Sequence, residues 1–473
     1  MSALLRRGTE WLRLDLLERL ERPPVVAPPA AVVRARMRAA AGIDGRPPSS
    51  GEGRAGADTL DAALDTALDA APAASRIAPD FRERASRARA VCLAVPDATR
   101  RGAWEPWVAP ALAWLERATP AAASRVVLVA SGVHRPALPE GVAGAAAAAS
   151  AWRVLANGAD GFASHVAVGA TSAGTEVRLH PLWVASDLRV ALADISFHYF
   201  AGFGGGRKLV FPGLAEPSGI LANHRRSLTA EGWPDPACEP GRLAGNPVHE
   251  DLVAAAALCP PHLLIQAYEP RPGADPVLEV GEPFASHEQA CARYAAGHRI
   301  EHTQRPELLV ADAGGTPRDA TFLQAHKSLQ HAARYLPDGG SLLLVAALEQ
   351  GSGSESFQRL WSLEPGELAR KAVESYELHT HTALALRCVT RRLEVAVLAS
   401  PASPIVPEAL SRAGIRAMVD PGEALRWIEE RGRGRAWGWL ARAEETLPER
   451  IGAEGGKRQP GLRQAEAAGE ERR

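Results

Sequence analysis

Short, continuous apolar segments recur along the sequence, and each is followed by a polar loop and then by a stretch of helical character. These segments span residues 88–95, 125–130, 189–194, 262–268, 307–312, 341–347 and 393–400. Apolar runs of this length are typical of buried strands in parallel sheets that helices cover on both faces. The alternation of strand, loop and helix therefore predicts an α/β fold, in which ligands bind beyond the carboxyl ends of the strands.

The chain is too long for a single core, because 473 residues exceed the size at which chains divide into domains. We expect two α/β domains with mainly parallel sheets and an active site in the cleft between them. The expected N-terminal domain spans residues 1–275, with a flexible insertion at 41–58, and the C-terminal domain spans 285–440. The charged segment 444–473 is expected to be a partly disordered tail.

Composition excludes several classes of protein. The net charge of −1 gives no electrostatic reason to bind nucleic acid or an anionic membrane. No apolar stretch is long enough to span a bilayer, and the first residues lack the apolar core of a signal peptide. The five cysteines form no C-x-x-C pair, which fits a reducing compartment. We therefore expect a cytoplasmic protein.

One stretch, residues 194–228, holds an unusual set of reactive groups: Lys208, His198 and His224 beside a run of glycines. The chain has 54 lysines and arginines together, but only four are lysines. A lysine amine can lose its proton and form a covalent bond, whereas a guanidinium stays charged. Lys208 is thus a candidate functional amine, with an ordinary surface lysine as the alternative.

Histidines follow two of the expected strands. His134 and His198 would lie on loops at strand ends, where two imidazoles can face one ligand and exchange protons near neutral pH. His224 is a candidate metal ligand, but no H-E-x-x-H motif supplies partners for it, so a bound small molecule would have to provide the other donors. His379 and His381 are less suited as ligands, because they are two residues apart in an expected helix.

Cationic groups near other strand ends suit an anionic substrate. Arg100, close to Asp97, can bind a carboxylate or a phosphate. Gln324 and Lys327 lie one helical turn apart and can hold a substrate carboxylate. The glycine run is not a P-loop, because Arg207 replaces the last glycine of that motif, but a phosphate-binding loop remains open.

Taken in order, these motifs resemble the nickel-pincer lactate racemase family. The resemblance covers roughly residues 85–355. It rests on D-x-T-R at 97–100, G-x-H-R at 132–135, H-Y-F-A-G-F-G-G-G-R-K at 198–208, P-G at 212–213, N-H at 223–224, G-N-P-V-H at 245–249, and G-G-x-P-x-D with Q-x-x-K within 314–327.

The resemblance implies a racemase or epimerase of a 2-hydroxy acid that works by reversible hydride transfer to a nickel-pincer nucleotide. It implies a covalent bond from this cofactor, Ni(II) pyridinium-3,5-bisthiocarboxylic acid mononucleotide, to Lys208. His224 would complete the nickel coordination, and His134 and His198 would be the acid/base pair. The implied cofactor contacts are Asp97, Ala98, Thr99, Arg100, Gly205 and Gly206, and the implied substrate contacts are Gln324 and Lys327. Cofactor-maturation proteins are the implied partners.

The sequence departs from the family pattern near the substrate. Leu323 stands where members that act on lactate tend to carry an aromatic residue, and Gly204 stands where serine is common. These departures favour a 2-hydroxy acid that is lactate-like or larger. Two alternatives are a catalytically idle cofactor-binding protein and a phosphate-ligand enzyme that uses the glycine loop.

Overall fold

The computed structural model describes residues 60, 62–63, 80–100, 102–149, 151–302, 304–405 and 407–450. The insertion expected at 41–58 and residues 451–473 of the expected tail lie outside this part of the chain. No helix in the described ranges is long and apolar enough to cross a membrane.

The first sheet has six strands in the order β10-β9-β6-β1-β2-β3. All neighbours run parallel except β10, which is antiparallel to β9. The strands are β1 (Ala90–Pro96), β2 (Ser124–Ala130), β3 (Trp152–Ala156), β6 (Leu188–Ala193), β9 (Leu263–Tyr268) and β10 (Val277–Gly281). This sheet contains the first four apolar runs, as predicted.

The second sheet is wholly parallel and has five strands in the order β15-β14-β13-β12-β16. Its strands are β12 (Leu308–Asp312), β13 (Ser341–Val345), β14 (Glu394–Leu398), β15 (Ile415–Met418) and β16 (Trp437–Leu440). The last three apolar runs form β12, β13 and β14. The prediction of two mainly parallel α/β sheets is therefore confirmed.

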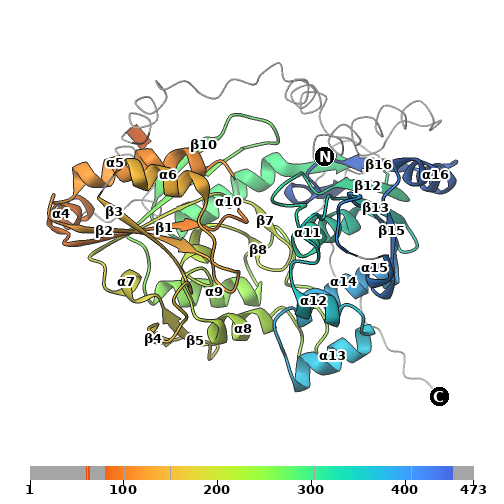
Figure 1. The fold of residues 1–473 in the computed structure, drawn as a ribbon, viewed down its shortest axis with the longest axis horizontal. Coiled ribbons are helices and arrows are strands. Elements are labelled where there is room, and N and C mark those ends of the chain that lie inside the picture. The colour runs from red at the N-terminus through yellow and green to blue at the C-terminus, as the bar shows by residue number, and fades with distance from the viewer. Residues whose placement is uncertain are drawn as a thin grey trace, which may run out of the picture.

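Helices flank both sheets, and the two α/β units lie side by side (Figure 1). In the first unit, α5 and α6 lie on one side of the sheet, and α8 and α9 lie on the other (Figure 1). The helices of this half are α4 (Phe81–Arg87), η2 (Glu105–Trp107), α5 (Val108–Ala118), α6 (Glu140–Ala148), α7 (Pro181–Val184), η3 (Gly206–Leu209), α8 (Pro217–Arg225), α9 (Pro247–Ala257) and α10 (Ala285–His298).

The second half carries the remaining helices and 3-10 turns. They are α11 (Phe322–Ala332), η4 (Ala333–Tyr335), α12 (Glu355–Leu360), α13 (Pro365–Glu374), α14 (Thr380–Arg392), α15 (Pro407–Arg412), α16 (Pro421–Gly432) and η5 (Ala443–Glu445). Three two-stranded sheets complete the fold: β4 (Val166–Ala170) with β5 (Glu176–Leu179), β7 (Phe197–His198) with β8 (Gly202–Phe203), and β11 (Arg299–His302) with β17 (Leu447–Arg450).

Alternate residues of each central strand enter different cores. In β1, Val91, Leu93 and Val95 pack beneath α5 and α6, whereas Cys92 and Ala94 face the opposite core. All five side chains are at most 1% exposed. Because successive side chains of a strand point to opposite faces, a sheet that is covered on both faces needs an unbroken apolar run. This explains why the strand-forming runs stand out in the sequence.

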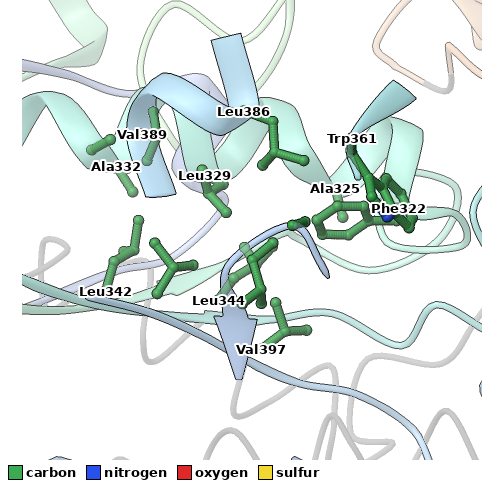
Figure 2. Packing of buried hydrophobic residues seen from close by; sticks show 14 of the residues in the cluster. Phe322, Ala325, Leu329, Ala332, Leu342, Leu344, Trp361, Leu386, Val389 and Val397 are labelled. Atoms are coloured by element: carbon green, nitrogen blue, oxygen red, sulfur yellow. The ribbon is translucent and has the colours of Figure 1, made fainter. Parts of the chain in front are cut away.

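The largest core of the second half lies between its sheet and α11 and α14 (Figure 2). Leu342 and Leu344 of β13 face Leu329 of α11 and Leu386 of α14 (Figure 2). Thr321 caps α11, because its hydroxyl accepts a hydrogen bond from the backbone N–H of Gln324. The apolar face of α11 is therefore fixed on the sheet, and its opposite face is left for other contacts.

Polar side-chain contacts and the pairing of β17 with β11 join the two halves of the chain. The hydroxyl oxygens of Tyr199 and Thr382 are 3.0 Å apart, and Arg442 donates to Glu269 at 2.7 Å. Near the end of the described chain, β17 pairs with β11, so residues 447–450 belong to the folded body. The ordered chain thus continues past residue 444, where we expected the tail to begin.

Truncation of a core leucine should destabilise the protein strongly. We expect Leu344→Ala to lower the free energy of unfolding by about 2–5 kcal/mol, because it leaves a cavity beneath α11 and α14. The matched control is Leu258→Ala, at a side chain that is 38% exposed, with an expected change below about 0.5 kcal/mol. Urea denaturation followed by circular dichroism measures both. Equal shifts in the two variants would contradict this account of the core.

Candidate active site

The reactive groups gather where β1 and β6 end. The chain proceeds from β1 to β2 and β3 on one side, and β6 and β9 lie on the other side, so the strand order reverses between β1 and β6. Loops that leave two such strands in opposite directions open a crevice between them. Asp97 follows β1, and the hairpin that contains His198 follows β6.

The Asp97 carboxylate orients His134. Asp97 is 3% exposed, and its Oδ2 lies 2.7 Å from Nδ1 of His134. Its Oδ1 accepts hydrogen bonds from the backbone N–H and the hydroxyl of Thr99, at 3.2 and 2.7 Å. Burial alone would raise the pKa of Asp97, but the hydrogen bond and charge of His134, the charge of Arg100 and the Thr99 hydroxyl together hold it below its usual value. An ionised Asp97 accepts the Nδ1 proton of His134 and leaves Nε2 of that ring free to accept a proton.

His198 has the complementary arrangement. Its Nδ1 accepts a hydrogen bond from the backbone N–H of Ala201 at 3.2 Å, so the neutral ring carries its proton on Nε2. Burial, followed by the charges of Lys208, Arg100, Lys327 and His224, places the pKa of His198 well below its usual value. His134 thus presents an acceptor and His198 presents a donor.

Lys208 lies in the short 3-10 turn η3, with its Nζ 5.9 Å from the centre of the Phe200 ring. Burial is the main cause that places the pKa of Lys208 well below its usual value, and the charges of Arg207, Arg100 and Lys327 act in the same direction. Burial therefore favours the neutral amine, which is the form that a nucleophilic lysine needs. Arg100 makes no side-chain hydrogen bond within the described residues, so its guanidinium is available to an anion.

The glycines before Lys208 are required by contacts with the protein itself. Gly205 and Gly206 have φ values of +71° and +52°, in the left-handed region that favours glycine. A Cβ on Gly205 would lie 2.0 Å from the carbonyl oxygen of Asp194, and one on Gly206 would lie 2.5 Å from the His287 ring. The sequence predicted close approach to a ligand at these positions, and the structure shows close approach to protein atoms.

Arg207 points away from the crevice. Its guanidinium bonds to Nε2 of His287 at 2.8 Å and donates to the carbonyl oxygen of Ala201 at 3.0 Å. Arg207 is 2% exposed. It therefore serves the packing of the glycine loop and does not present a charge to a phosphate, which weakens the alternative of a phosphate-binding loop.

His224, near the end of α8, has the features of a metal ligand. Its Nδ1 is buried and has no hydrogen-bond partner. Burial, followed by the charges of Lys208, His379 and His134, lowers its pKa to about 3, so the imidazole is neutral. Within the described residues, no group of three or more His, Cys, Asp or Glu side chains could hold a metal ion. A metal at His224 would need donors from a bound molecule.

His381 lies beside His224, but both of its ring nitrogens already have hydrogen-bond partners. The two ring centres are 5.3 Å apart. Nδ1 of His381 bonds to the Tyr376 hydroxyl at 2.7 Å, and Nε2 lies 3.1 Å from the Thr382 hydroxyl. With both nitrogens engaged, His381 is unsuited to coordinate a metal, as the sequence indicated, but it contributes a wall of the site that the sequence did not reveal.

Gln324 and Lys327 lie together on α11, where Nζ of Lys327 donates to Oε1 of Gln324. Burial and the charge of Arg100 lower the pKa of Lys327 to about 7, against the opposing charges of Glu444 and Asp97. Asp97 and Arg100 belong to the first half of the chain, so Lys327 faces them electrostatically from the second half. The structure thus brings the predicted residues of both halves to one site.

Sequence reasoning missed an acidic group at the edge of this site. Arg318 pairs with Glu444 at 2.6 Å and with Glu445 at 2.9 Å. Burial is the main cause that raises the pKa of Asp194 to about 6, although Arg100 and Arg318 oppose it. We had assigned Glu444 and Glu445 to the tail because the sequence around them is charged, and no local pattern distinguishes a tail from a segment held by a distant arginine.

Comparison with known proteins agrees with the sequence and the fold. Residues 54–233 match the model of the lactate racemase N-terminal domain. The chain is 28% identical over 210 residues to a lactate racemase from Thermoanaerobacterium thermosaccharolyticum, covering 43% of this chain and 47% of that protein. It is 27% identical over 262 residues to a lactate racemase from Lactiplantibacillus plantarum, covering 54% and 60%. The aligned region thus spans about half the length of these curated relatives.

Two solved structures share the fold. The lactate racemase apoprotein from T. thermosaccharolyticum superposes with a TM-score of 0.69 at 20% identity and covers 82% of this chain and 93% of that one. A Thermotoga maritima protein superposes with a TM-score of 0.57 at 14% identity and covers 79% and 98%. The N-terminal domain match and the two curated relatives thus show similarity to lactate racemases over part of the chain, and the solved apoprotein shows that the chain shares its fold.

Proposed function

We propose that this protein is a racemase or epimerase of a 2-hydroxy acid that uses a nickel-pincer nucleotide bound to Lys208. The observation that carries the proposal is that five kinds of group converge between the two α/β units. Lys208 is a lysine whose burial favours the neutral amine, and His224 has a buried nitrogen without a partner. His134 and His198 have opposite hydrogen-bonding character, and Gln324 with Lys327 can bind a carboxylate. The similarity to lactate racemases supports the reaction class.

The described residues fit such a cofactor. Burial favours the neutral form of the Lys208 amine, which is the form that can be acylated, and Nδ1 of His224 is a buried atom without a hydrogen-bond partner. Arg100 offers an uncommitted guanidinium for the phosphate or carboxylate of a nucleotide. When bound, the cofactor would supply a reversible hydride acceptor, which is needed because the α-hydrogen of a hydroxy acid is poorly acidic.

Lys327 and Gln324 would hold the substrate carboxylate. The ammonium form of Lys327 can pair with the carboxylate while the amide of Gln324 fixes its orientation. A bound carboxylate replaces the missing counter-charge and raises the pKa of Lys327, because an opposite charge nearby favours the protonated form. Substrate binding and protonation of Lys327 are therefore coupled.

The two histidines would handle the hydroxyl proton. Nε2 of His134 accepts the proton of a hydroxyl group that faces it, and Asp97 stabilises the imidazolium that forms. Nε2–H of His198 would donate a hydrogen bond to the substrate oxygen when the substrate presents its other face, and the His134 imidazolium holds the proton that this oxygen regains. Two such groups are needed because the enantiomers direct their hydroxyl groups to different sides of the site.

Replacement of the tethering lysine should remove the cofactor. We expect Lys208→Arg, expressed with the cofactor-maturation pathway, to lose both the covalent adduct seen by intact-mass spectrometry and all racemase activity, because arginine stays charged. The matched control is Lys371→Arg, since Lys371 pairs with Glu377 away from the site. Full activity of Lys208→Arg would overturn the tether. Stoichiometric nickel and an adduct without turnover of any hydroxy acid would favour the idle cofactor-binding protein.

The acid/base pair should be separable from cofactor binding. We expect His134→Ala and His198→Ala each to lower kcat by about 10²–10⁴-fold while the adduct on Lys208 is retained. Asp97→Asn should also lower kcat, because an amide can donate to Nδ1 of His134 and so hold the ring in the wrong tautomer. Polarimetry measures activity and intact mass measures the adduct. Loss of the adduct in the alanine variants would mean that these histidines bind the cofactor instead.

The pH dependence should follow Lys327. With a pKa of about 7, its amine is charged below that pH and neutral above it, so kcat/KM should fall as the pH rises through 7. An unperturbed lysine, with a pKa of about 10.4, would place this loss three units higher. Lys327→Arg should have lower activity but no such alkaline limb. If kcat/KM of Lys327→Arg still falls as the pH rises through 7, a group other than Lys327 causes the pH dependence.

A further inference from the structure

A third histidine, His379, lies at the active site without a structural task of its own. It precedes α14, whose first turn is fixed on the first half of the chain by His381 beside His224 and by Thr382 bonded to Tyr199. The charge of His134 acts on His379, and that of His379 acts on His224. The His379 ring is therefore within electrostatic reach of both groups.

The nitrogens of His379 are uncommitted. In the part of the chain that the structure describes, neither ring nitrogen makes a hydrogen bond, whereas His381 uses both of its nitrogens and Nδ1 of His326 donates to the carbonyl oxygen of Leu323. The His379 ring only packs at 6.1 Å from the Phe357 ring. It is partly buried and can therefore contact a ligand.

The backbone of His379 is unfavourable for a histidine. Its φ is +75°, and only two other non-glycine residues in the described ranges, Leu348 and Arg442, have positive φ. Glycine or asparagine would adopt this conformation more readily. Strained backbone of this kind persists at sites where a particular side chain has a function.

The side chain that flanks the carboxylate pair on α11 is apolar. Leu323 lies one turn before Lys327 on the same face of α11, so it flanks the place where Lys327 would hold the carboxylate. Its side chain is aliphatic and partly buried. A polar group on the substrate side chain would find its partner at His379.

We propose that His379 binds the side chain of the substrate. The substrate would be a 2-hydroxy acid that carries an additional hydroxyl or carboxylate group at or beyond C3. A neutral imidazole both donates and accepts hydrogen bonds, so it suits either oxygen group. This assignment rests on the proposed racemase function and specifies its substrate class.

The test compares near-isosteric substrates. Glycerate and 2-hydroxybutyrate differ by a hydroxyl in place of a methyl group, and malate adds a carboxylate. With nickel-loaded protein, we expect the wild type to prefer glycerate or malate over 2-hydroxybutyrate in kcat/KM by about tenfold or more. The identity of the preferred substrate distinguishes the hydroxyl from the carboxylate.

The diagnostic variant is His379→Gly, which removes the ring and relieves the backbone, so its melting temperature should equal or exceed that of the wild type. We expect it to reduce the polar-to-apolar preference about tenfold. His379→Asn, which keeps a polar group and tolerates the same backbone, should recover part of the preference. Calorimetric Kd values for the same substrates provide a readout besides turnover.

Two outcomes would overturn the inference in different ways. If the wild type racemises 2-hydroxybutyrate and glycerate equally, and His379→Gly leaves the ratio unchanged, His379 does not contact the substrate side chain and the racemase function stands. If cofactor-loaded wild type racemises none of the three acids, the proposed function itself fails.

Discussion

The site is organised by the crowding of positive groups in the seam between the two halves of the chain, a largely buried region that contains Arg100, Lys208 and Lys327. Arg100, Lys208 and Lys327 act on one another, and burial lowers the pKa of both lysines. Guanidinium groups keep their charge under such conditions, but amines can lose it. The seam can therefore accommodate three cationic side chains only because two of them are lysines. This accounts for the retention of lysine at positions 208 and 327 in a chain that uses arginine almost everywhere else.

Acidic groups limit this crowding and connect the halves of the chain. Asp97 lowers the positive potential on one side, and Glu444 with Glu445 pairs with Arg318 on the other. A buried ion pair gains little net stability, but the loss of one partner leaves an uncompensated buried charge. The segment after β16 is thus part of the site's electrostatics, and the pairing of β17 with β11 also holds it to the folded body.

The sequence predicted the strands well because the sheets are covered on both faces. All seven apolar runs form internal strands of the two large sheets, whereas the missed strands of these sheets, β3, β10, β15 and β16, lie at the edges, where fewer residues need to be apolar. The site was predictable where reactive residues directly follow strands, as for Asp97 and His198. It was not predictable where the interacting groups are distant in sequence, as for the charge of His134 acting on His379, because local patterns contain no information on how two sheets meet.

The glycine loop shows the same limit at the level of single atoms. The sequence indicates that Gly205 and Gly206 permit close approach, but not what approaches them. In the structure they seat the loop on Asp194 and His287, which fixes the turn that carries Lys208. These two glycines therefore fix the position of the loop through contacts with protein atoms.

Phe200 shows how one apolar side chain can set the geometry of several polar ones. Its ring, 6% exposed, lies 4.5 Å from the His198 ring, 5.2 Å from His224 and 5.0 Å from His381, and the amine of Lys208 is 5.9 Å away. The three histidine rings meet it edge to face, an arrangement that is favoured for aromatic pairs. The same ring excludes water from the amine and the imidazoles, and burial is the largest cause of their lowered pKa values. Phe200 therefore links His198, Lys208 and His224, which are candidates for the acid/base group, the tether and the metal ligand, so that their separation along residues 198–224 does not separate them in space.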